Sequence, residues 1–529
     1  MSWMSSVLTT LWPWFLCLVL VWPGGSHAAE GLAVGIAKTE ITPPVGTPLA
    51  GYGQYYGQPS RGVHDPLYAR ALALTREGQT VVVVACDLVL IDGPLRHAVL
   101  TTIRRYQPLR ADALILVATH THTGAGALGA RLWERLIMGL YDPQIFTQVA
   151  DRIAQAALLA LRQPIGVTAA VGQTRIDALV ANRMDAQLAL PQTLKVVQFQ
   201  APSGRIVGRL LFMAAHPTLA PWQCREFSAD YPGVLTQTLE QHDPGSVAVF
   251  VQGAAGDLAP QTAAGLAPRA RSTVYGLALA DAVLHLAFTP VVLDGAWSRE
   301  LVEIPLPPVQ LRVGFVHVPA WVGNRLLPRR TVLQVVRLGP LLFLALPGEW
   351  AAETGQALEQ LIASAGWRPF LLGYANDYIG YVIPRRYYGQ PTLYEARVSF
   401  YGPHLAAYLQ QQVQHLVSHL DPAGPPRSAV PPRSVSEKRL GSPVEGEQSA
   451  KCREIGARGA KWTKRLGMAY STLHHGASPP SLCRRESGAE HSAFSVLLWN
   501  RSSPCLEGKP KRLIPGSRIL GTCTPRHPT

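Results

Sequence analysis

Two histidines one residue apart, His120 and His122, are the side chains best placed for chemistry in this sequence. They follow the apolar run 114–118, which is typical of a strand buried on both faces, and the Thr and Gly residues after them predict a turn. Open α/β sheets bind ligands at the carboxyl ends of such strands. We expect one histidine to bind a metal and the other to carry a proton, with the two rings on opposite faces of the segment. The alternative is a pair of surface histidines on a loop.

Other apolar runs also end on polar residues, namely His216, Asp257 and Glu349, and a further run leads to Tyr381. Strand ends that carry such side chains predict a single crevice. Two histidines and a carboxylate are the ligands of a catalytic zinc, which keeps one position open for water. Each residue also has a structural interpretation: His216 as a core histidine, Glu349 as a helix cap and Tyr381 as a packed aromatic.

The elements that must position these residues follow from the periodicity of apolar residues. We predict strands at 34–44, 68–75, 80–89, 114–118, 167–171, 194–199, 207–214, 246–251, 332–336, 341–346 and 370–373, and helices at 94–106, 143–163, 231–241, 267–286, 351–363 and 404–419. Residues 287–331 look less regular, and Gly51-Tyr-Gly53 reads as a loop that needs a close backbone approach. The expected class is α/β, with mixed multi-stranded sheets covered by helices and no internal sequence repeat.

The two ends of the chain are predicted to lie outside this fold. Residues 1–29 read as a signal peptide, because the apolar run 8–22 is short and Ser26-His27-Ala28 suits signal peptidase, so we expect a secreted or periplasmic protein. Residues 422–529 are rich in Pro, Ser, Gly and Arg and are predicted to be a disordered basic tail. Since the net charge of +14 is concentrated there, it gives no reason to expect nucleic-acid binding by residues 30–421.

A series of motifs over residues 32–420 resembles the catalytic domain of the neutral/alkaline, non-lysosomal ceramidase family. The motifs occur in the family's order: Ala37-Lys-Thr-Glu-Ile-Thr-Pro-Pro44, Gly51-Tyr-Gly53, Thr119-His-Thr-His-Thr-Gly124, Asn182-Arg183, Ala215-His-Pro-Thr218, Ser228-Ala-Asp-Tyr-Pro-Gly233, Gly256-Asp257, Pro347-Gly-Glu349 and Tyr378-Ile-Gly-Tyr381.

The resemblance implies a role for each matching residue. It implies that zinc is held by His120, His216, Glu349 and Tyr381, that His122 is the general base, and that Arg183 and Tyr394 hold the substrate carbonyl. A water activated by zinc would then attack an amide, and the two donors would stabilise the oxyanion. Asp230 or Asp257 would either orient a ligand imidazole or cap a loop.

Two departures from the family limit the transfer. Ala259 stands where the family has a serine, which excludes a serine nucleophile there and leaves ceramide specificity open. Residues 422–529 also lack the alternating strands of the immunoglobulin-like domain that follows the family's catalytic domain. We therefore expect a zinc-dependent amidohydrolase that cleaves ceramide or a similar N-acyl amide lipid at a membrane surface. The alternatives are a hydrolase of another amide or ester, and a non-catalytic protein of the same fold that binds lipid or glycan.

Overall fold

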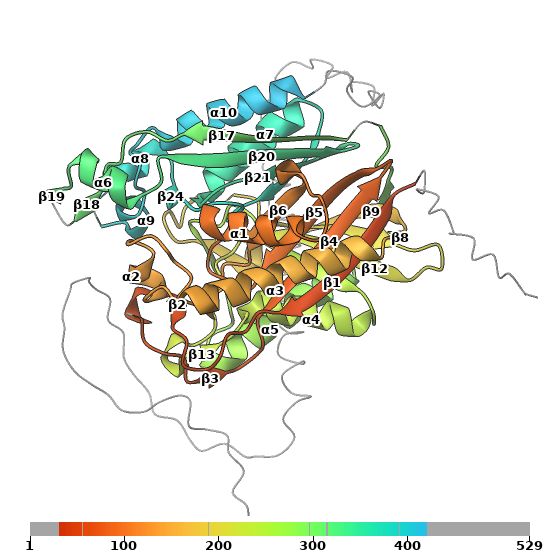
Figure 1. Ribbon diagram of the computed structural model, residues 1–529, viewed down its shortest axis with the longest axis horizontal. Helices are drawn as coiled ribbons and strands as arrows, with labels where there is room; N and C mark the ends of the chain where they lie inside the picture. Colours follow the sequence, from red (N-terminus) through yellow and green to blue (C-terminus); the bar gives the residue numbers. More distant parts are fainter. Residues whose placement is uncertain are drawn as a thin grey trace, which may run out of the picture.

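The computed structural model describes residues 31–420, apart from 56, 189, 296, 314, 315 and 391 (Figure 1). The predicted signal peptide and the predicted disordered tail lie outside these residues. The described part of the chain is built from three multi-stranded sheets with helices on their outer faces, which confirms the predicted α/β class. In that part, no helix combines the length and the apolar character needed to cross a bilayer.

The three sheets repeat one arrangement of strands. Each has a central antiparallel hairpin, an antiparallel strand on one side and a parallel strand on the other. The first contains β1 (Ala33–Glu40), β4 (Tyr68–Arg76), β5 (Gln79–Cys86), β6 (Leu114–Ala118) and β8 (Ile165–Gly166); the second β9 (Thr168–Arg175), β11 (Thr193–Gln200), β12 (Ile206–Met213), β14 (Val247–Gln252) and β16 (Thr289–Val291); the third β17 (Ser298–Pro305), β20 (Arg330–Leu338), β21 (Leu341–Ala345) and β23 (Arg368–Leu372).

The helices repeat as well. In each unit one helix crosses from the hairpin to the parallel strand, and a second follows that strand along the chain. The crossover helices are α1 (Gly93–Arg104), α4 (Asp230–His242) and α7 (Ala352–Ser364), and the second helices are α3 (Pro143–Arg162), α5 (Pro268–Leu284) and α10 (Leu405–His419). Figure 1 shows α1 with α3, α4 with α5, and α7 with α10, each pair beside its own sheet. The structure therefore contains a threefold repeat that the sequence does not reveal, because packing constrains apolar character and length more than residue identity.

One core joins the inner faces of the three sheets. It includes Val34 and Val117 from the first sheet, Val249 from the second and Phe343 from the third, none more than 3% exposed. Residues on the opposite faces pack beneath the helices in separate clusters. Because the sheets are covered on both faces, their strands read in the sequence as continuous apolar runs.

The three parallel edge strands meet at their carboxyl ends. The Ala118 amide donates to the Tyr374 carbonyl at 3.2 Å, and the Gly373 amide donates to the Gln252 carbonyl at 2.8 Å. A Cβ on Gly373 would lie 2.3 Å from the Gly253 oxygen, so this junction requires glycine. The loops that leave the sheets are thereby collected at one place.

Short elements complete the fold around this junction. They are β2 (Leu49–Gly51), β3 (Gly62–Val63), β7 (Thr123–Ala125), α2 (Arg135–Met138), β10 (Val180–Asn182), β13 (Glu226–Phe227), β15 (Leu258–Pro260), β18 (Arg312–Val313), β19 (Val316–His317), α6 (Ala320–Leu326), β22 (Glu349–Trp350), β24 (Tyr381–Val382), α8 (Arg385–Tyr388) and α9 (Tyr394–Arg397), with 3-10 turns at Gly53–Tyr55, Ala111–Ala113, Asp177–Leu179 and Trp222–Cys224. The strand β17 lies in the region predicted to be less regular: its pattern is mixed because it is a half-buried edge strand.

Candidate active site

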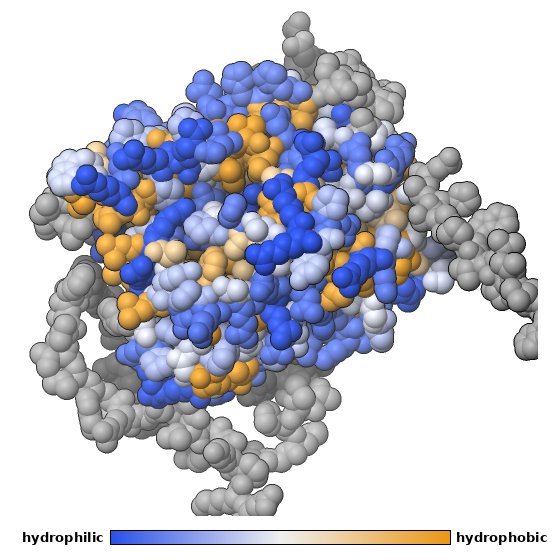
Figure 2. Space-filling view, viewed as in Figure 1, coloured by the Kyte–Doolittle hydropathy of each residue, from blue (hydrophilic) through white to orange (hydrophobic). Residues whose placement is uncertain are grey.

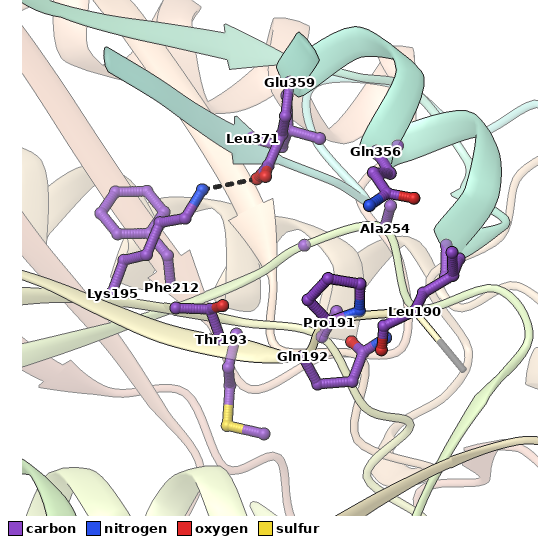
Figure 3. Close-up of a pocket in the computed structure, with 15 residues that line it drawn as sticks. Leu190, Pro191, Gln192, Thr193, Lys195, Phe212, Ala254, Gln356, Glu359 and Leu371 are labelled. Carbon is purple, nitrogen blue, oxygen red and sulfur yellow. Dashed lines mark hydrogen bonds and ion pairs between the residues drawn. The ribbon is translucent and has the colours of Figure 1, made fainter. Parts of the chain in front are cut away.

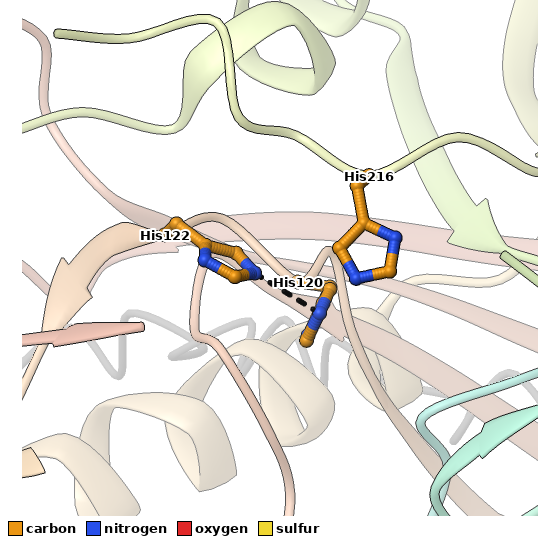
Figure 4. Close-up of side chains that lie close together, drawn as sticks. All are labelled: His120, His122 and His216. Atoms are coloured by element: carbon orange, nitrogen blue, oxygen red, sulfur yellow. Dashed lines mark hydrogen bonds between the residues drawn. The ribbon is translucent and has the colours of Figure 1, made fainter. Parts of the chain in front are cut away.

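The strand ends bring most of the predicted site residues together. The loop after β6 carries His120 and His122, the loop after β12 carries His216, and β21 leads to Glu349. One ring nitrogen from each of the three histidines lies within 4.8 Å of the other two (Figure 4). Residues up to 229 positions apart in the sequence, from His120 to Glu349, thus lie together, as the shared strand ends predicted.

The expectation that His120 and His122 point to opposite faces is wrong. Residues two apart on a strand share a face, and His120 in addition leaves the extended conformation with a φ of +68°. The two Nε2 atoms lie 3.1 Å apart, as the dashed line in Figure 4 marks. The interpretation of a surface pair is also wrong for His120, which is 2% exposed.

The rings of His120 and His216 are oriented by backbone carbonyls. Nδ1 of His120 lies 2.5 Å from the Val89 oxygen, and Nδ1 of His216 lies 2.7 Å from the Ala255 oxygen. A carbonyl can only accept, so each Nδ1 carries the proton and each Nε2 presents a lone pair. This fixes the tautomer of both histidines with their Nε2 atoms turned toward Glu349.

Glu349 faces both histidines at close range. Its Oε2 lies 3.3 Å from His120 Nε2 and 3.1 Å from His216 Nε2, and its Oε1 accepts from the Tyr378 hydroxyl at 2.5 Å. Oε1 thus accepts a hydrogen bond, as a carboxylate oxygen does, while Oε2 faces the two Nε2 lone pairs that the fixed tautomers present.

Two of the imidazoles are held in the neutral form. Burial, and to a smaller extent the charge of Arg183, lowers the pKa of His216 to about 4. Burial lowers the pKa of His122 well below its usual range. The Nδ1 atom of His122 is buried without a hydrogen-bond partner among the described residues. Because Nε2 of His120 presents a lone pair, Nε2 of His122, 3.1 Å away, is the nitrogen that carries the proton.

Arg183 lies at the edge of this cluster. Its Nε donates to Glu395 at 2.7 Å, while its Nη2 donates to the Gly256 carbonyl at 2.8 Å and to the Tyr381 hydroxyl at 3.0 Å. The same Nη2 lies 3.4 Å from His216 Nε2. Several fixed acceptors therefore hold one positive charge beside the histidines.

The two predicted tyrosines, Tyr381 and Tyr394, differ in their burial. The Tyr381 hydroxyl is buried and lies 3.3 Å from His216 Nε2. The ring of Tyr394 packs edge-on against Tyr381 with centroids 5.8 Å apart, and it is 54% exposed. Tyr381 thus belongs to the buried cluster, and Tyr394 lies between the cluster and solvent.

Asp257 and Asp230 cap loops, and neither contacts the imidazole of a described histidine. The Asp257 carboxylate accepts from the Ala352 amide and from the Asn182 side chain, each at 2.7 Å, and so caps α7. Asp230 accepts from the amides of Leu219 and Ala220, both at 2.8 Å. Of the two roles considered for these aspartates, the loop cap is the one that the contacts support.

Several residues at the site were not singled out as site residues from the sequence. Tyr374 and Tyr378 both direct their hydroxyls at Glu349. The ring of Tyr52 packs edge-on against His122, with centroids 4.9 Å apart. A Cβ on Gly51 would lie 2.5 Å from the His122 Cα, which confirms the predicted close approach of the Gly51-Tyr-Gly53 loop. The aromatic residues in these motifs were the available signal.

A separate cavity of about 170 Å³ lies between β11, β12 and α7, and it contains none of the predicted site residues. Figure 3 shows Lys195 and Glu359 in an ion pair of 2.7 Å across it, with Gln192 and Gln356 nearby. Both charges are already paired, so this cavity offers no free group for catalysis.

Part of the chain is similar to members of a known enzyme family. Residues 32–273 match the family model described as neutral/alkaline non-lysosomal ceramidase, N-terminal. Neutral ceramidase B of Dictyostelium discoideum is 32% identical over 129 residues, which is 22% of this chain and 17% of that protein. Neutral ceramidase of Pseudomonas aeruginosa is 26% identical over 246 residues, which is 43% of this chain and 36% of that protein. These alignments thus span well under two thirds of either relative.

Two solved structures share the fold. The crystal structure of neutral ceramidase from Pseudomonas aeruginosa has a TM-score of 0.66 at 21% identity and covers 75% of this chain and 76% of that chain. A structure described as ceramidase complexed with C2 has the same TM-score at 20% identity, with 78% and 77% covered. The resemblance predicted from the motifs is confirmed by the family match and the shared fold.

Proposed function

We propose that this chain, whose residues 32–273 match the N-terminal part of the neutral/alkaline ceramidase family, is an exported zinc-dependent amidohydrolase. Its substrate would be ceramide or a similar N-acyl amide lipid, cleaved to a fatty acid and an amine. The observation that carries the proposal is the convergence of His120 Nε2, His216 Nε2 and Glu349 Oε2 in a buried cluster.

The donor atoms suit a cation. Two imidazole lone pairs and a carboxylate oxygen that face one another repel unless a positive charge lies between them. A tetrahedral zinc with ligand bonds of about 2.0–2.1 Å separates its ligand atoms by about 3.3 Å. Glu349 Oε2 lies 3.3 Å and 3.1 Å from the two nitrogens. His120, His216 and Glu349 would hold the ion, with the Tyr381 oxygen as a fourth contact.

Bound zinc supplies Lewis-acid polarisation of the carbonyl and lowers the pKa of a water molecule. His122 supplies the proton transfer. With His120 bound to the metal, the His122 ring beside it could accept the proton of the attacking water and return it to the leaving amine. Since Tyr52 and Gly51 pack against this ring, the base is positioned by its neighbours.

Arg183 and Tyr394 complete the site as donors to the carbonyl oxygen. Arg183 is held by Glu395 and Gly256, so little reorganisation accompanies charge development. The phenol of Tyr394, whose pKa is raised to about 12, stays protonated at neutral pH and can donate its hydroxyl hydrogen. Its exposure places it where a substrate entering from solvent would pass.

Metal analysis and turnover together test this function. Purified full-length protein is expected to contain about one zinc per chain and to release fatty acid from ceramide dispersed in detergent. His120→Ala is expected to lose both the metal and the activity. Zinc-free active protein, or unchanged activity in His120→Ala, would contradict the proposal. Export is tested separately by sequencing the N-terminus of protein recovered outside the cytoplasm, which is expected to begin near Ala29.

A second substrate class is favoured by Ala259. This residue pairs with Ala181 between β10 and β15, two positions after the α7 cap Asp257, and offers no hydroxyl. The site would then hydrolyse another amide or ester. A panel of N-acyl sphingoid bases, simple N-acyl amides and matched esters distinguishes the two. Tight lipid binding without turnover of any of these would support the non-catalytic alternative.

A further inference from the structure

Four large apolar side chains are exposed at one end of the molecule. They are Leu132, Leu136, Leu140 and Trp321, which are 62%, 74%, 77% and 63% exposed, and we call them the apolar rim. Three flank or lie on α2, and the fourth lies on α6. Figure 1 shows α2 and α6 at the same end of the molecule, and Figure 2 shows hydrophobic side chains at that end.

The exposure of the leucines is built into a well-anchored segment. Met138 is 1% exposed and Glu134 is fully buried, while the Trp133 ring stacks on Tyr378 with centroids 5.6 Å apart. The inward side chains thus fix the segment and turn the leucines toward solvent. Apolar side chains gathered in this way mark an interaction surface more often than those scattered singly.

The apolar rim is connected to the candidate active site. The segment that carries α2 follows His122 through the short strand β7. Trp133 contacts Tyr378, and the Tyr378 hydroxyl donates to Glu349. The segment that carries the leucines is therefore joined to the histidine cluster through directly contacting side chains.

Three exposed arginines lie near the rim, and the partly exposed Asp142, two residues after Leu140, accepts from the Gln144 amide as the cap of α3. Arg135, Arg325 and Arg329 are exposed, and none of them forms an ion pair with another described residue. Arg325 lies over the Trp321 ring at 5.3 Å. Glu134 is buried, so it presents no negative charge to solvent. Apolar side chains surrounded by unpaired arginines complement a bilayer that contains anionic lipids.

We propose that the apolar rim docks this protein on an anionic lipid bilayer, with the leucines inserted at the headgroup level and the arginines at the lipid phosphates. In relation to hydrolysis the inference rests on the proposed function, because a lipid amide is presented to the site from such a surface. The docking itself requires no turnover and can be measured alone.

Vesicle binding by the full chain tests the docking. Vesicles of phosphatidylcholine with phosphatidylglycerol are expected to bind the protein, and phosphatidylcholine alone is expected to bind it more weakly. The double variant Leu136→Ser/Leu140→Ser is expected to lower the partition coefficient by at least about tenfold, since burying one leucine alone is equivalent to about tenfold or more. Val292→Ser is the matched control, because Val292 is 69% exposed outside the rim.

Trp321→Ser is the second, independent variant and is expected to weaken binding as well. Equal binding of wild type and both rim variants would overturn the proposal, as would a loss of equal size in Val292→Ser. Dissociation of a dimer by the rim substitutions, without a change in vesicle binding, would assign the surface to a second copy of the chain and also overturn it. Thermal unfolding of each variant identifies any loss of folding.

Hydrolysis is a separate readout. Rim variants are expected to lose activity on bilayer-embedded ceramide and to keep activity on a water-soluble short-chain N-acyl amide. If the protein hydrolyses neither substrate, the proposed function fails while vesicle binding still decides the docking. If rim variants lose activity on both substrates to the same extent, the rim acts on the site itself and the docking role is contradicted.

Discussion

The Nε2 atom of His122 lies 3.1 Å from the Nε2 atom of His120, although only one residue separates them. The left-handed backbone at His120 and the contact of Gly51 with His122 bring this about. The two rings have different surroundings. Nδ1 of His120 faces the Val89 carbonyl, whereas Nδ1 of His122 has no hydrogen-bond partner among the described residues. This difference underlies the division between a metal ligand and a proton carrier.

Zinc content should distinguish the roles of His120 and His122. His120→Ala removes a lone pair that faces Glu349, so the variant is expected to lose zinc. His122→Ala is expected to retain zinc and lose turnover by about 10²–10⁴-fold, which is the usual contribution of a general base. Elemental analysis with a kinetic assay checks both. Loss of zinc in His122→Ala would instead make all three histidines ligands.

Gly51→Ala should disturb the base without removing it. The new Cβ would lie 2.5 Å from the His122 Cα, and the φ of +119° adds backbone strain. We expect zinc to be retained and kcat to fall. Gly46→Ala is the matched control, since Gly46 has a φ of +105° with nothing within 4 Å of the new Cβ. An equal loss of kcat in both variants would attribute the effect to strain alone.

The two carbonyl donors should affect kcat more than KM. Arg183→Gln and Tyr394→Phe each remove a donor to the developing oxyanion, for which about 10²–10³-fold in kcat is typical. Tyr408→Phe serves as the control, because its hydroxyl donates to the Pro305 carbonyl away from the site. Steady-state kinetics on a soluble amide checks this. A change confined to KM would show that these groups only bind the substrate.

The buried Arg70 of β4 should contribute more to stability than a half-exposed ion pair does. Arg70 donates to Asp87 at 3.1 Å and to Glu240 at 3.0 Å with little exposure of any partner. Arg70→Met leaves the buried Asp87 without its ion-pair partner and leaves Glu240 paired only with Lys38, so it is expected to cost about 3–5 kcal/mol of the free energy of unfolding. Lys38→Met breaks a half-exposed contact with Glu240 and should cost less than about 1 kcal/mol. Denaturant unfolding measures the free energy of unfolding of both variants. Equal losses in the two would contradict the larger contribution of Arg70.

The stability of the α2 segment should depend on pH through Glu134. Burial, followed by the charge of Asp92, raises the pKa of Glu134 from 4.5 to about 7. The folded state therefore holds the proton more tightly, and its stabilisation is complete below pH 4.5 and is lost as the pH rises through 7. Glu134→Gln is expected to flatten this decline by about 1.4 kcal/mol per unit of pKa shift. Melting temperatures at pH 5 and 8 check it: a decline as steep as in the wild type would contradict the role of Glu134.

Apolar periodicity was sufficient to predict the main strands and helices of the described chain. The three hairpin–helix–strand units are covered on both faces, so their strands appear as continuous apolar runs such as Leu114–Ala118. Edge strands were harder to predict from the sequence. The strand β17 was not predicted, because a half-buried strand has no clear alternation of apolar and polar residues. The positions of His120, His216 and Glu349 after predicted strands were also visible in the sequence.

By itself, the sequence determined which residues stand at strand ends, because periodicity and residue type are local properties. The tertiary structure decided how those residues face one another. The direction of the His122 ring, the capping role of Asp257 and the contacts of Tyr374 and Tyr378 with Glu349 depend on backbone conformation and on loops from different sheets. The threefold repeat likewise emerged only in the structure, since strand pairing is set by contacts between distant segments and leaves no matching residues along the chain.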